Sequence, residues 1–273
     1  MGYLKMKKFL LLPIIFLVLS GCYGAQKKMS PVSIRNIKTL AIVPIESPPL
    51  VIDPFMSMDY IAPNSAYLIT APSQSLQMVG YVSVIVSGIY LLAELPEATK
   101  RSAKVAESIE NILDRGGAWI PSIAFARETA KQISANEKYD VVLMQNVQKY
   151  PGLENGERTS SMRTWLKATS NWYNEEISQF SYKSFTDQNI DAVLEVGIYQ
   201  YVILKDRIAL GLILKLVDPM TGHVLGRARV FEESLQKTKE ILDDNAYKFK
   251  EAFSNLGAEL INKNLRYIGL TSE

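Results

Sequence analysis

The chain has 273 residues, of which 48% are hydrophobic and 21% charged, and its formal net charge is +2. This length is enough for one domain with a substantial core, with or without an insertion. Three lysines and no acidic residue precede residue 22, so removing them leaves 27 of the 30 basic side chains against 28 acidic ones. Such a balance argues against a nucleic-acid partner and against a polybasic lipid-binding patch.

The N-terminus has the features of a bacterial lipoprotein signal. Lys5, Lys7 and Lys8 precede an apolar run over residues 9–19, and the run ends in the sequence Leu-Ser-Gly-Cys at residues 19–22. The run is too short to span a bilayer as a helix. Together with the basic start and the small residues before a cut, it predicts a secretory signal peptide over residues 1–21. We interpret residues 19–22 as a lipobox.

Cys22 is the predicted lipidation site. It is the only cysteine of the chain, so it cannot form an internal disulfide bond. After cleavage at a lipobox its sulfur would carry diacylglycerol and its freed amine a third acyl chain. Several acyl chains on one residue give stable attachment to membrane lipid. The alternative is an ordinary cleaved signal peptide that ends at a chance cysteine.

The residues after Cys22 predict where the domain lies. Residue 23 is Tyr rather than the Asp that retains many enterobacterial lipoproteins in the inner membrane, which favours the outer membrane and its periplasmic face. Residues 22–34 are polar and are predicted to form a lipidated tether. At no more than about 3.5 Å per residue, this tether would hold the domain within about 40 Å of the lipid. Residues 35–273 would then form a single periplasmic domain.

The first part of this domain has a pattern of strand, insertion, helix and strand. Residues 39–45 are an apolar run stopped by Pro48 and Pro49, which is typical of a buried strand. Residues 139–144 are predicted to form a second strand. Between them a helical pattern opens at Pro121, and its apolar face is formed by Ile123, Ala126, Ala130 and Ile133.

Another helix is predicted over residues 161–180, with Ser161 as its N-cap. Its apolar residues recur at helical spacing. They are Met162, Trp165, Leu166, Thr169, Trp172, Tyr173, Ile177 and Phe180. We interpret this aromatic stripe as a core face rather than as a ligand-binding site.

Strict alternation of apolar residues predicts two strands with one strongly buried face between residues 191 and 217. Lys205 and Asp206 make a tight reversal between these strands. Residues 218–222 supply a Pro that fixes φ and a Gly for a left-handed position, before a third strand over residues 224–231. An antiparallel meander results, and a final helix over about residues 245–266 would cover its apolar face.

Three of these segments resemble the envelope domains of CsgG and of the TolB N-terminal-like family. They are residues 40–45, the stretch Asp-Ala-Val-Leu-Glu-Val-Gly at 191–197, and the stretch Leu-Lys-Leu-Val-Asp-Pro-Met-Thr-Gly-His-Val-Leu at 214–225. The resemblance implies an α/β sandwich (α+β) with a mixed sheet and helices packed on it. It also implies noncatalytic work in envelope assembly, secretion or scaffolding. The chain departs from CsgG by a large apolar insertion over about residues 50–118.

The centre of this insertion carries no charge, since no charged residue occurs between Asp59 and Glu94. Three structures for residues 78–93 remain open. The first is a buried or interface helix, and the second is a transmembrane helix, which ordinarily needs about 20 apolar residues. The third is a membrane-spanning β-strand flanked by Tyr81 and Tyr90. A helix over residues 98–113 would return the chain to the domain.

No set of residues forms a catalytic signature. His223, the only histidine, lies beside a turn glycine, and we expect it and Asp218 to be structural parts of that turn. Zinc sites need several His or Cys ligands, which a chain with one of each cannot supply. Ser234 fits an S-x-x-K pattern but lacks its companion motifs. Two adjacent acidic pairs, 175–176 and 243–244, are expected to be solvated.

The sequence therefore favours a noncatalytic lipoprotein that scaffolds or assists an envelope assembly or secretion complex, without cofactor or metal. Its partners would be membrane lipid, through acylated Cys22, and envelope proteins or further copies of the chain, through residues 60–93. The alternatives are a CsgG-like oligomeric secretion conduit and a hydrolase that acts on the cell wall or on lipid.

Overall fold

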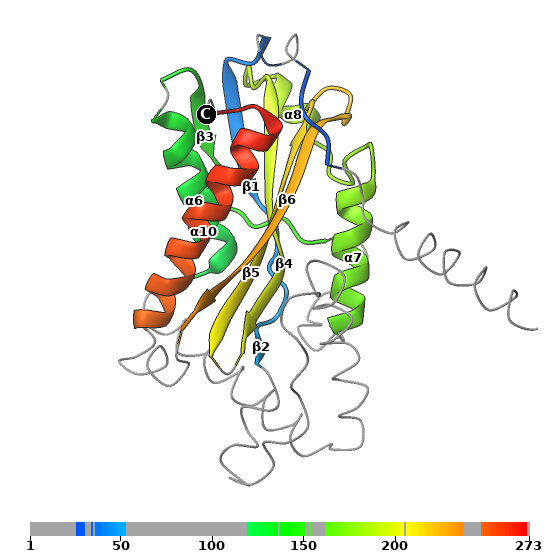
Figure 1. Ribbon diagram of the computed structural model, residues 1–273. Helices are drawn as coiled ribbons and strands as arrows, with labels where there is room; N and C mark the ends of the chain where they lie inside the picture. Colours follow the sequence, from blue (N-terminus) through cyan, green and yellow to red (C-terminus); the bar gives the residue numbers. More distant parts are fainter. Residues whose placement is uncertain are drawn as a thin grey trace, which may run out of the picture.

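The computed structural model describes residues 26–30, 34, 36–52, 119–135, 137–150, 153, 162–204, 206–236 and 247–271. Cys22, residues 60–93 and the predicted helix over residues 98–113 lie outside these ranges, so the expectations for them stay predictions. The described residues form a central sheet with helices on both faces (Figure 1).

The sheet is mixed, with the strand order β3-β1-β4-β5-β6. These strands are β1 (Thr39–Pro44), β3 (Asp140–Leu143), β4 (Ala192–Ile203), β5 (Arg207–Val217) and β6 (Val224–Leu235). β1 is parallel to β3 and β4, whereas β4, β5 and β6 are antiparallel neighbours. A short strand, β2 (Val51–Ile52), adds to β4 beyond the end of β1. The predicted mixed sheet with an antiparallel meander is therefore confirmed, and β6 continues beyond its expected end at Phe231.

The turn between β5 and β6 is held by its own side chains. One carboxylate oxygen of Asp218 accepts hydrogen bonds from the backbone N–H groups of Met220 (2.8 Å) and Thr221 (3.2 Å). Gly222 has a φ of 74°, in the left-handed region that glycine occupies without steric cost. Pro219 fits the fixed φ of such a turn, so the predicted reversal is confirmed.

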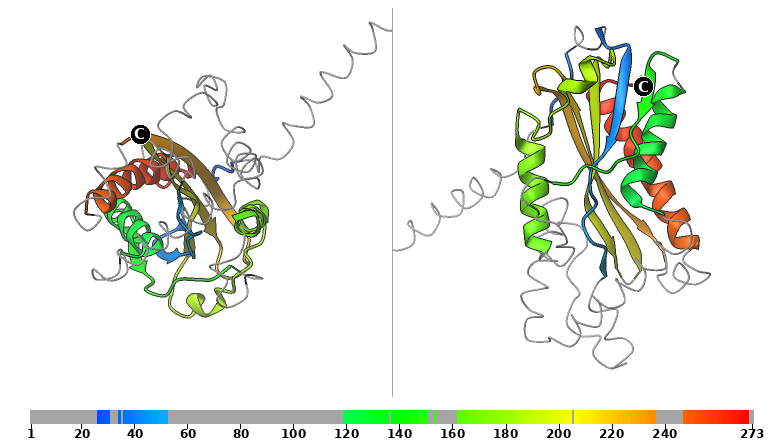
Figure 2. Two further views of the ribbon diagram at one scale, coloured as in Figure 1. Left: turned by 90° about the horizontal axis from the view of Figure 1, so that it is seen from below. Right: turned by 180° about the vertical axis from the view of Figure 1, so that it is seen from behind.

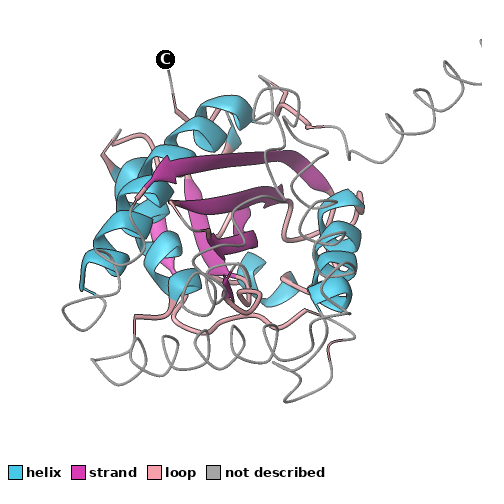
Figure 3. Ribbon diagram, turned by 60° about the horizontal axis from the view of Figure 1, so that its bottom comes forward, coloured by secondary structure: helices cyan, strands magenta, loops and turns pink. Residues whose placement is uncertain are grey.

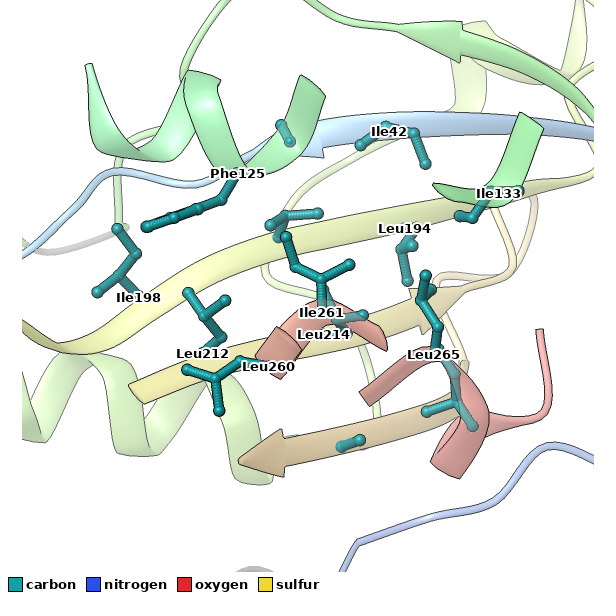
Figure 4. Packing of buried hydrophobic residues seen from close by; sticks show 14 of the residues in the cluster. Ile42, Phe125, Ile133, Leu194, Ile198, Leu212, Leu214, Leu260, Ile261 and Leu265 are labelled. Carbon is teal, nitrogen blue, oxygen red and sulfur yellow. The ribbon is translucent and has the colours of Figure 1, made fainter. Parts of the chain in front are cut away.

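One face of the sheet is covered by α6 (Pro121–Ser134) and α10 (Tyr247–Ile268), as Figures 1 and 2 show. Apolar side chains fill the space between these two helices and the sheet. Figure 4 shows Leu194, Leu212 and Leu214 from the sheet against residues of α6 and α10. The residues of α10 that meet the sheet recur three or four positions apart, and they include Phe249, Phe253, Leu256 and Leu260. Both helices were predicted: α6 begins at Pro121 as expected, and α10 lies within two residues of its expected ends.

The opposite face carries α7 (Met162–Asn174) and the short α8 (Lys183–Thr186), and Figure 3 shows helices on both sides of the strands. Trp165, Trp172 and Tyr173 of α7 are buried against β1, β4 and β5. The aromatic residues of α7 therefore form a core face, as expected, whereas Ile177 of the predicted stripe is 55% exposed. The prediction of one strongly buried face for β4 and β5 was wrong, because α7 covers the second face and buries the alternate residues too.

The prediction that α7 continues to Phe180 was also wrong. The backbone carbonyl of Trp172 accepts a hydrogen bond from Lys215 (2.5 Å), and that of Asn174 accepts one from Arg227 (2.9 Å). These side chains take the place of the backbone N–H groups that a further helical turn would supply. The helix ends at Asn174, and Ile177 forms a β-bridge with His223.

Candidate functional site

The residues that the sequence analysis considered for catalysis lie in a turn and on a strand of the sheet. His223 is exposed, and its carbonyl accepts a hydrogen bond from the Asp218 backbone N–H (2.9 Å). The Asp218 carboxylate binds the turn. Both residues therefore belong to the turn, as predicted. Ser234 lies on β6, where the Gln236 side-chain amide lies 3.5 Å from its hydroxyl. Residues 237, 243 and 244 lie outside the described ranges.

A buried polar cluster lies between α7 and the sheet, and the sequence analysis missed it. Its centre is Glu195 on β4, which has no exposed surface. The carboxylate accepts hydrogen bonds from the indole N–H of Trp172 (2.7 Å), the hydroxyl of Ser178 (2.5 Å) and the hydroxyl of Tyr182 (3.1 Å). All three donors come from α7 and the segment that follows it. Glu195 therefore fixes this whole segment to the sheet.

Lys215 completes the cluster from the neighbouring strand. It lies directly opposite Glu195 in the β4–β5 register and is also fully buried. Burial raises the pKa of Glu195, while the positive charge of Lys215 and the three hydrogen bonds oppose that rise. Burial likewise lowers the pKa of Lys215, and Glu195 opposes that change. The two groups are sealed from solvent, so this pair has a structural role.

The close approach of Trp172 depends on a glycine. A Cβ atom added at Gly197 would lie 2.8 Å from two carbon atoms of the Trp172 ring. The ring also lies 5.6 Å from the Lys215 ammonium and makes an edge contact with Tyr150. The absence of a side chain at residue 197 therefore lets Trp172 reach the Glu195 carboxylate.

Arg227 extends the row of charges to the edge strand, where it pairs with Lys215 in the β5–β6 register. Its guanidinium donates to the backbone carbonyls of Tyr173 (3.2 Å) and Asn174 (2.9 Å), at the end of α7. A cation at a helix C-terminus is favourable because the last carbonyls lack helical partners. The same guanidinium lies 2.9 Å from the carboxylate of Glu176.

The outer edge of β6 is covered by residues from the N-terminus. The backbone of Lys27 exchanges two hydrogen bonds with that of Arg227, at 2.9 and 2.8 Å. The ammonium of Lys27 lies 2.8 Å from the Glu176 carboxylate and donates to the Val224 carbonyl (2.6 Å). We call residues 26–30 the docked segment. An edge strand covered in this way is protected from pairing with unrelated chains.

The docked segment contradicts part of the prediction that residues 22–34 form a tether. Met29 is only 2% exposed, and its backbone N–H donates to the carbonyl of Ile268 at the end of α10 (3.3 Å). The side-chain amide of Gln26 donates to the Arg229 carbonyl (2.9 Å). Residues 26–30 therefore belong to the folded domain and are not a free spacer. Only residues 23–25 would remain between the predicted lipidation site and Gln26, so these two residues would lie at most about 14 Å apart.

Replacing Glu176 by Gln should loosen the docked segment. Its carboxylate contacts both Lys27 and Arg227, and the hydrogen bond from Lys27 is the largest cause of its lowered pKa. A lowered carboxyl pKa gives stability that is present above the ordinary value of 4.5 and is lost as the pH falls through the lowered value. Because Glu176 is 56% exposed, we expect an effect of at most about 1 kcal/mol.

Hydrogen exchange measures this loosening directly. The amides of Lys27 and Met29 should exchange faster in the Glu176→Gln variant, and the wild type should approach the variant as the pH falls below 4.5. Glu175→Gln is the matched control, since Glu175 is the exposed neighbouring carboxylate. Equal exchange rates in both variants and the wild type would show that Glu176 does not hold the segment.

Within the described ranges, no group of three or more His, Cys, Asp and Glu residues is arranged to hold a metal ion. No helix in that same part of the chain is long and apolar enough to cross a membrane.

Comparison of the fold with solved structures finds distant likenesses. A PelC dodecamer from Paraburkholderia phytofirmans aligns over 88% of this chain and 93% of its own, with 11% identity and a TM-score of 0.37. A hypothetical protein from Chlamydia trachomatis aligns over 86% of this chain and 99% of its own, with 8% identity and a TM-score of 0.36. A lipoprotein from Neisseria meningitidis aligns over 52% and 85%, with 14% identity and a TM-score of 0.25.

These TM-scores are too low to carry a functional comparison. No protein-family model matches the chain, and no curated protein sequence matches it either. The resemblance to CsgG and TolB therefore stays a prediction from the sequence.

Proposed function

We propose that this protein is a noncatalytic lipoprotein of the bacterial envelope, anchored at the periplasmic face of the outer membrane, where it scaffolds or assists an assembly or secretion complex. The observation that carries this proposal is the short distance along the chain from lipobox to domain. Cys22 precedes the first docked residue, Gln26, by four positions. An anchor coupled so closely to a folded domain keeps the domain at the lipid surface.

The noncatalytic part of the proposal is supported by the environment of two fully buried charged residues, Glu195 and Lys215. Glu195 and Lys215 have the perturbed pKa values that active sites often show. Both are fully buried beneath Trp172, and their hydrogen bonds connect α7 to the sheet. A substrate cannot reach them in this fold, so they stabilise the domain.

The partner-binding part of the proposal depends on residues 60–93, which contain no charged side chain. Deleting these residues should abolish self-association or co-purification of envelope proteins in mild detergent, while Cys22 keeps the protein on the membrane. The physical reason is that so long an uncharged stretch is an aggregation liability unless it is covered by a partner. Size-exclusion chromatography with light scattering, and analysis of co-purified proteins, measure the effect.

A point substitution tests the same segment with less disturbance. Val84→Asp introduces a charge at its centre, and Val84→Thr is the matched control of similar shape. The aspartate variant should lose partners and the threonine variant should keep them. If the parent and the deletion variant are both monomers without partners, the segment only contributes to core packing and the scaffold proposal is wrong.

A further inference from the structure

The docked segment has a direction along β6, and this direction bears on how the domain meets the membrane. Lys27 pairs with Arg227 in the antiparallel sense. One residue earlier, the side-chain amide of Gln26 donates to the carbonyl of Arg229, which lies two positions further along β6. Followed toward its N-terminus, the chain therefore leaves Lys27 in the direction in which β6 runs. That direction leads toward Leu235, at the end of the strand.

The lengths involved allow Cys22 to approach the end of β6. Cys22 precedes Gln26 by four positions, which span at most about 14 Å. The stretch of β6 from Arg229 to Leu235 measures about 20 Å at roughly 3.3 Å per residue. Fully extended toward that end, the chain from Gln26 to Cys22 covers most of this length. The turn that contains Met220 precedes β6 and therefore lies at the opposite end of this strand from Leu235.

The end of the sheet near Leu235 exposes apolar side chains. Leu235 is 75% exposed and lies opposite Arg207, the first residue of β5. Tyr247, the first residue of α10, is 63% exposed. Figure 1 shows the tip of β6 and the start of α10 at the same end of the molecule. We call this the β6–α10 end. An exposed aliphatic side chain and an exposed Tyr at the same end of the molecule suit a lipid interface, because a Tyr ring is apolar with a polar tip.

The insertion joins the domain at this end as well. Ile52, the last residue of β2, pairs with Ile203 at the end of β4. On the other side of the insertion, the ring of Trp119 lies 6.1 Å from that of Phe249 in the first turn of α10. The two points where the insertion joins the domain therefore lie at the β6–α10 end.

We propose that the domain stands on the lipid surface with its β6–α10 end, so that Leu235 and Tyr247 contact lipid and the turn at Met220 points away. This orientation rests on the proposed function, since it needs the anchor at Cys22. The occupant of the β6–α10 end is the lipid surface that carries the acyl chains. A protein partner on this end is the alternative that the experiment below separates.

Two single-cysteine variants test the orientation, Leu235→Cys and its matched control Met220→Cys. Met220 is also strongly exposed, at 68%, so neither substitution disturbs packing. Cys22 is the only native cysteine, and its acylated sulfur is a thioether, so the introduced thiol is the only one that reacts with a fluorophore. The labelled full-length lipoproteins are reconstituted into vesicles of phosphatidylethanolamine and phosphatidylglycerol that contain nitroxide-labelled lipid, and are isolated by flotation.

The label at residue 235 should lose most of its fluorescence to the lipid nitroxide and shift its emission to the blue. The label at residue 220 should keep its fluorescence and be quenched by aqueous iodide. If the protein floats but the label at residue 220 is the one quenched by lipid, or neither label is, the orientation is wrong while the anchor stands. A label at residue 235 that is shielded from both quenchers indicates a protein contact and also overturns the proposal. If the protein does not float with the vesicles, both the proposed anchor and the proposed orientation are wrong.

Discussion

Replacing Lys215 by Met should lower the free energy of unfolding by about 3–5 kcal/mol, because removing one partner of a buried charged pair leaves the other uncompensated. Lys215 lies opposite Glu195, both are fully buried, and Lys215 also donates to the Trp172 carbonyl. Denaturant unfolding of the detergent-solubilised mature protein measures the change.

The same variant should respond to pH in a defined direction. Burial raises the pKa of Glu195, and loss of the Lys215 charge removes one of the effects that oppose this rise. Above the ordinary carboxyl pKa of 4.5 the folded variant then binds more protons than the unfolded chain. Its stability should therefore fall as the pH rises, more steeply than that of the wild type.

Two further variants separate the charge pair from a general packing effect. Lys263→Met removes a partly exposed lysine that pairs with Glu232 and Glu259, and it should cost at most about 1 kcal/mol. Adding Glu195→Gln to Lys215→Met removes the remaining buried charge and should restore part of the lost stability. A Lys215→Met variant as stable as Lys263→Met, with no rescue in the double variant, would show that the two buried groups are not coupled.

Replacing Cys22 by Ser should release the protein from membranes completely, which is the largest functional effect that we expect. Serine cannot form the thioether that carries diacylglycerol, and the hydrophobic attachment of the acyl chains is lost with it. The single substitution is compared with a second variant in which residues 1–21 are also replaced by a signal peptide that is cleaved without lipidation, which separates retention by an uncut signal from attachment through lipid. Cell fractionation after a high-salt wash measures the result.

Incorporation of radiolabelled palmitate provides the independent readout. The wild-type protein should be labelled and the Cys22→Ser variant should not. A variant that stays with the membrane after the wash, together with an unlabelled wild type, would show that Cys22 is not the anchor. A labelled wild type whose variant still stays with the membrane would identify a second attachment.

Most of the central sheet could be predicted from the sequence, because its strands have strong local patterns. The apolar run at β1, the alternation of β4 and β5 and the turn at Asp218 each agree with the structure. The helices α6 and α10 could be predicted because apolar residues recur on one face and Pro121 marks a start.

The buried cluster could not be predicted, because alternation assigns Glu195 and Lys215 to the face opposite the apolar residues, and such polar residues ordinarily face water. What buries them is α7, which reaches that face only in the folded domain. The aromatic stripe of α7 was a signal that a second sheet face would be covered, but it did not identify the strand residues beneath it.

The docked segment was missed for a different reason. Residues 26–30 are short and mostly polar, and they have neither the alternation nor the length of a strand. Their position is set by tertiary contacts of Lys27 with Arg227 and Glu176. Met29, a single apolar residue within the polar stretch, was the one local signal that this segment packs on the domain.

The central claim, that this protein acts through partners rather than through catalysis, is tested most directly by crosslinking in intact cells. The full-length protein, anchored through Cys22, is crosslinked in place, purified in mild detergent and analysed for bound proteins and for activity on cell-wall and lipid substrates. We predict envelope proteins in stoichiometric amounts and no turnover. A ring of identical subunits would favour the conduit instead, and a monomer without partners that turns over a cell-wall or lipid substrate would contradict the claim.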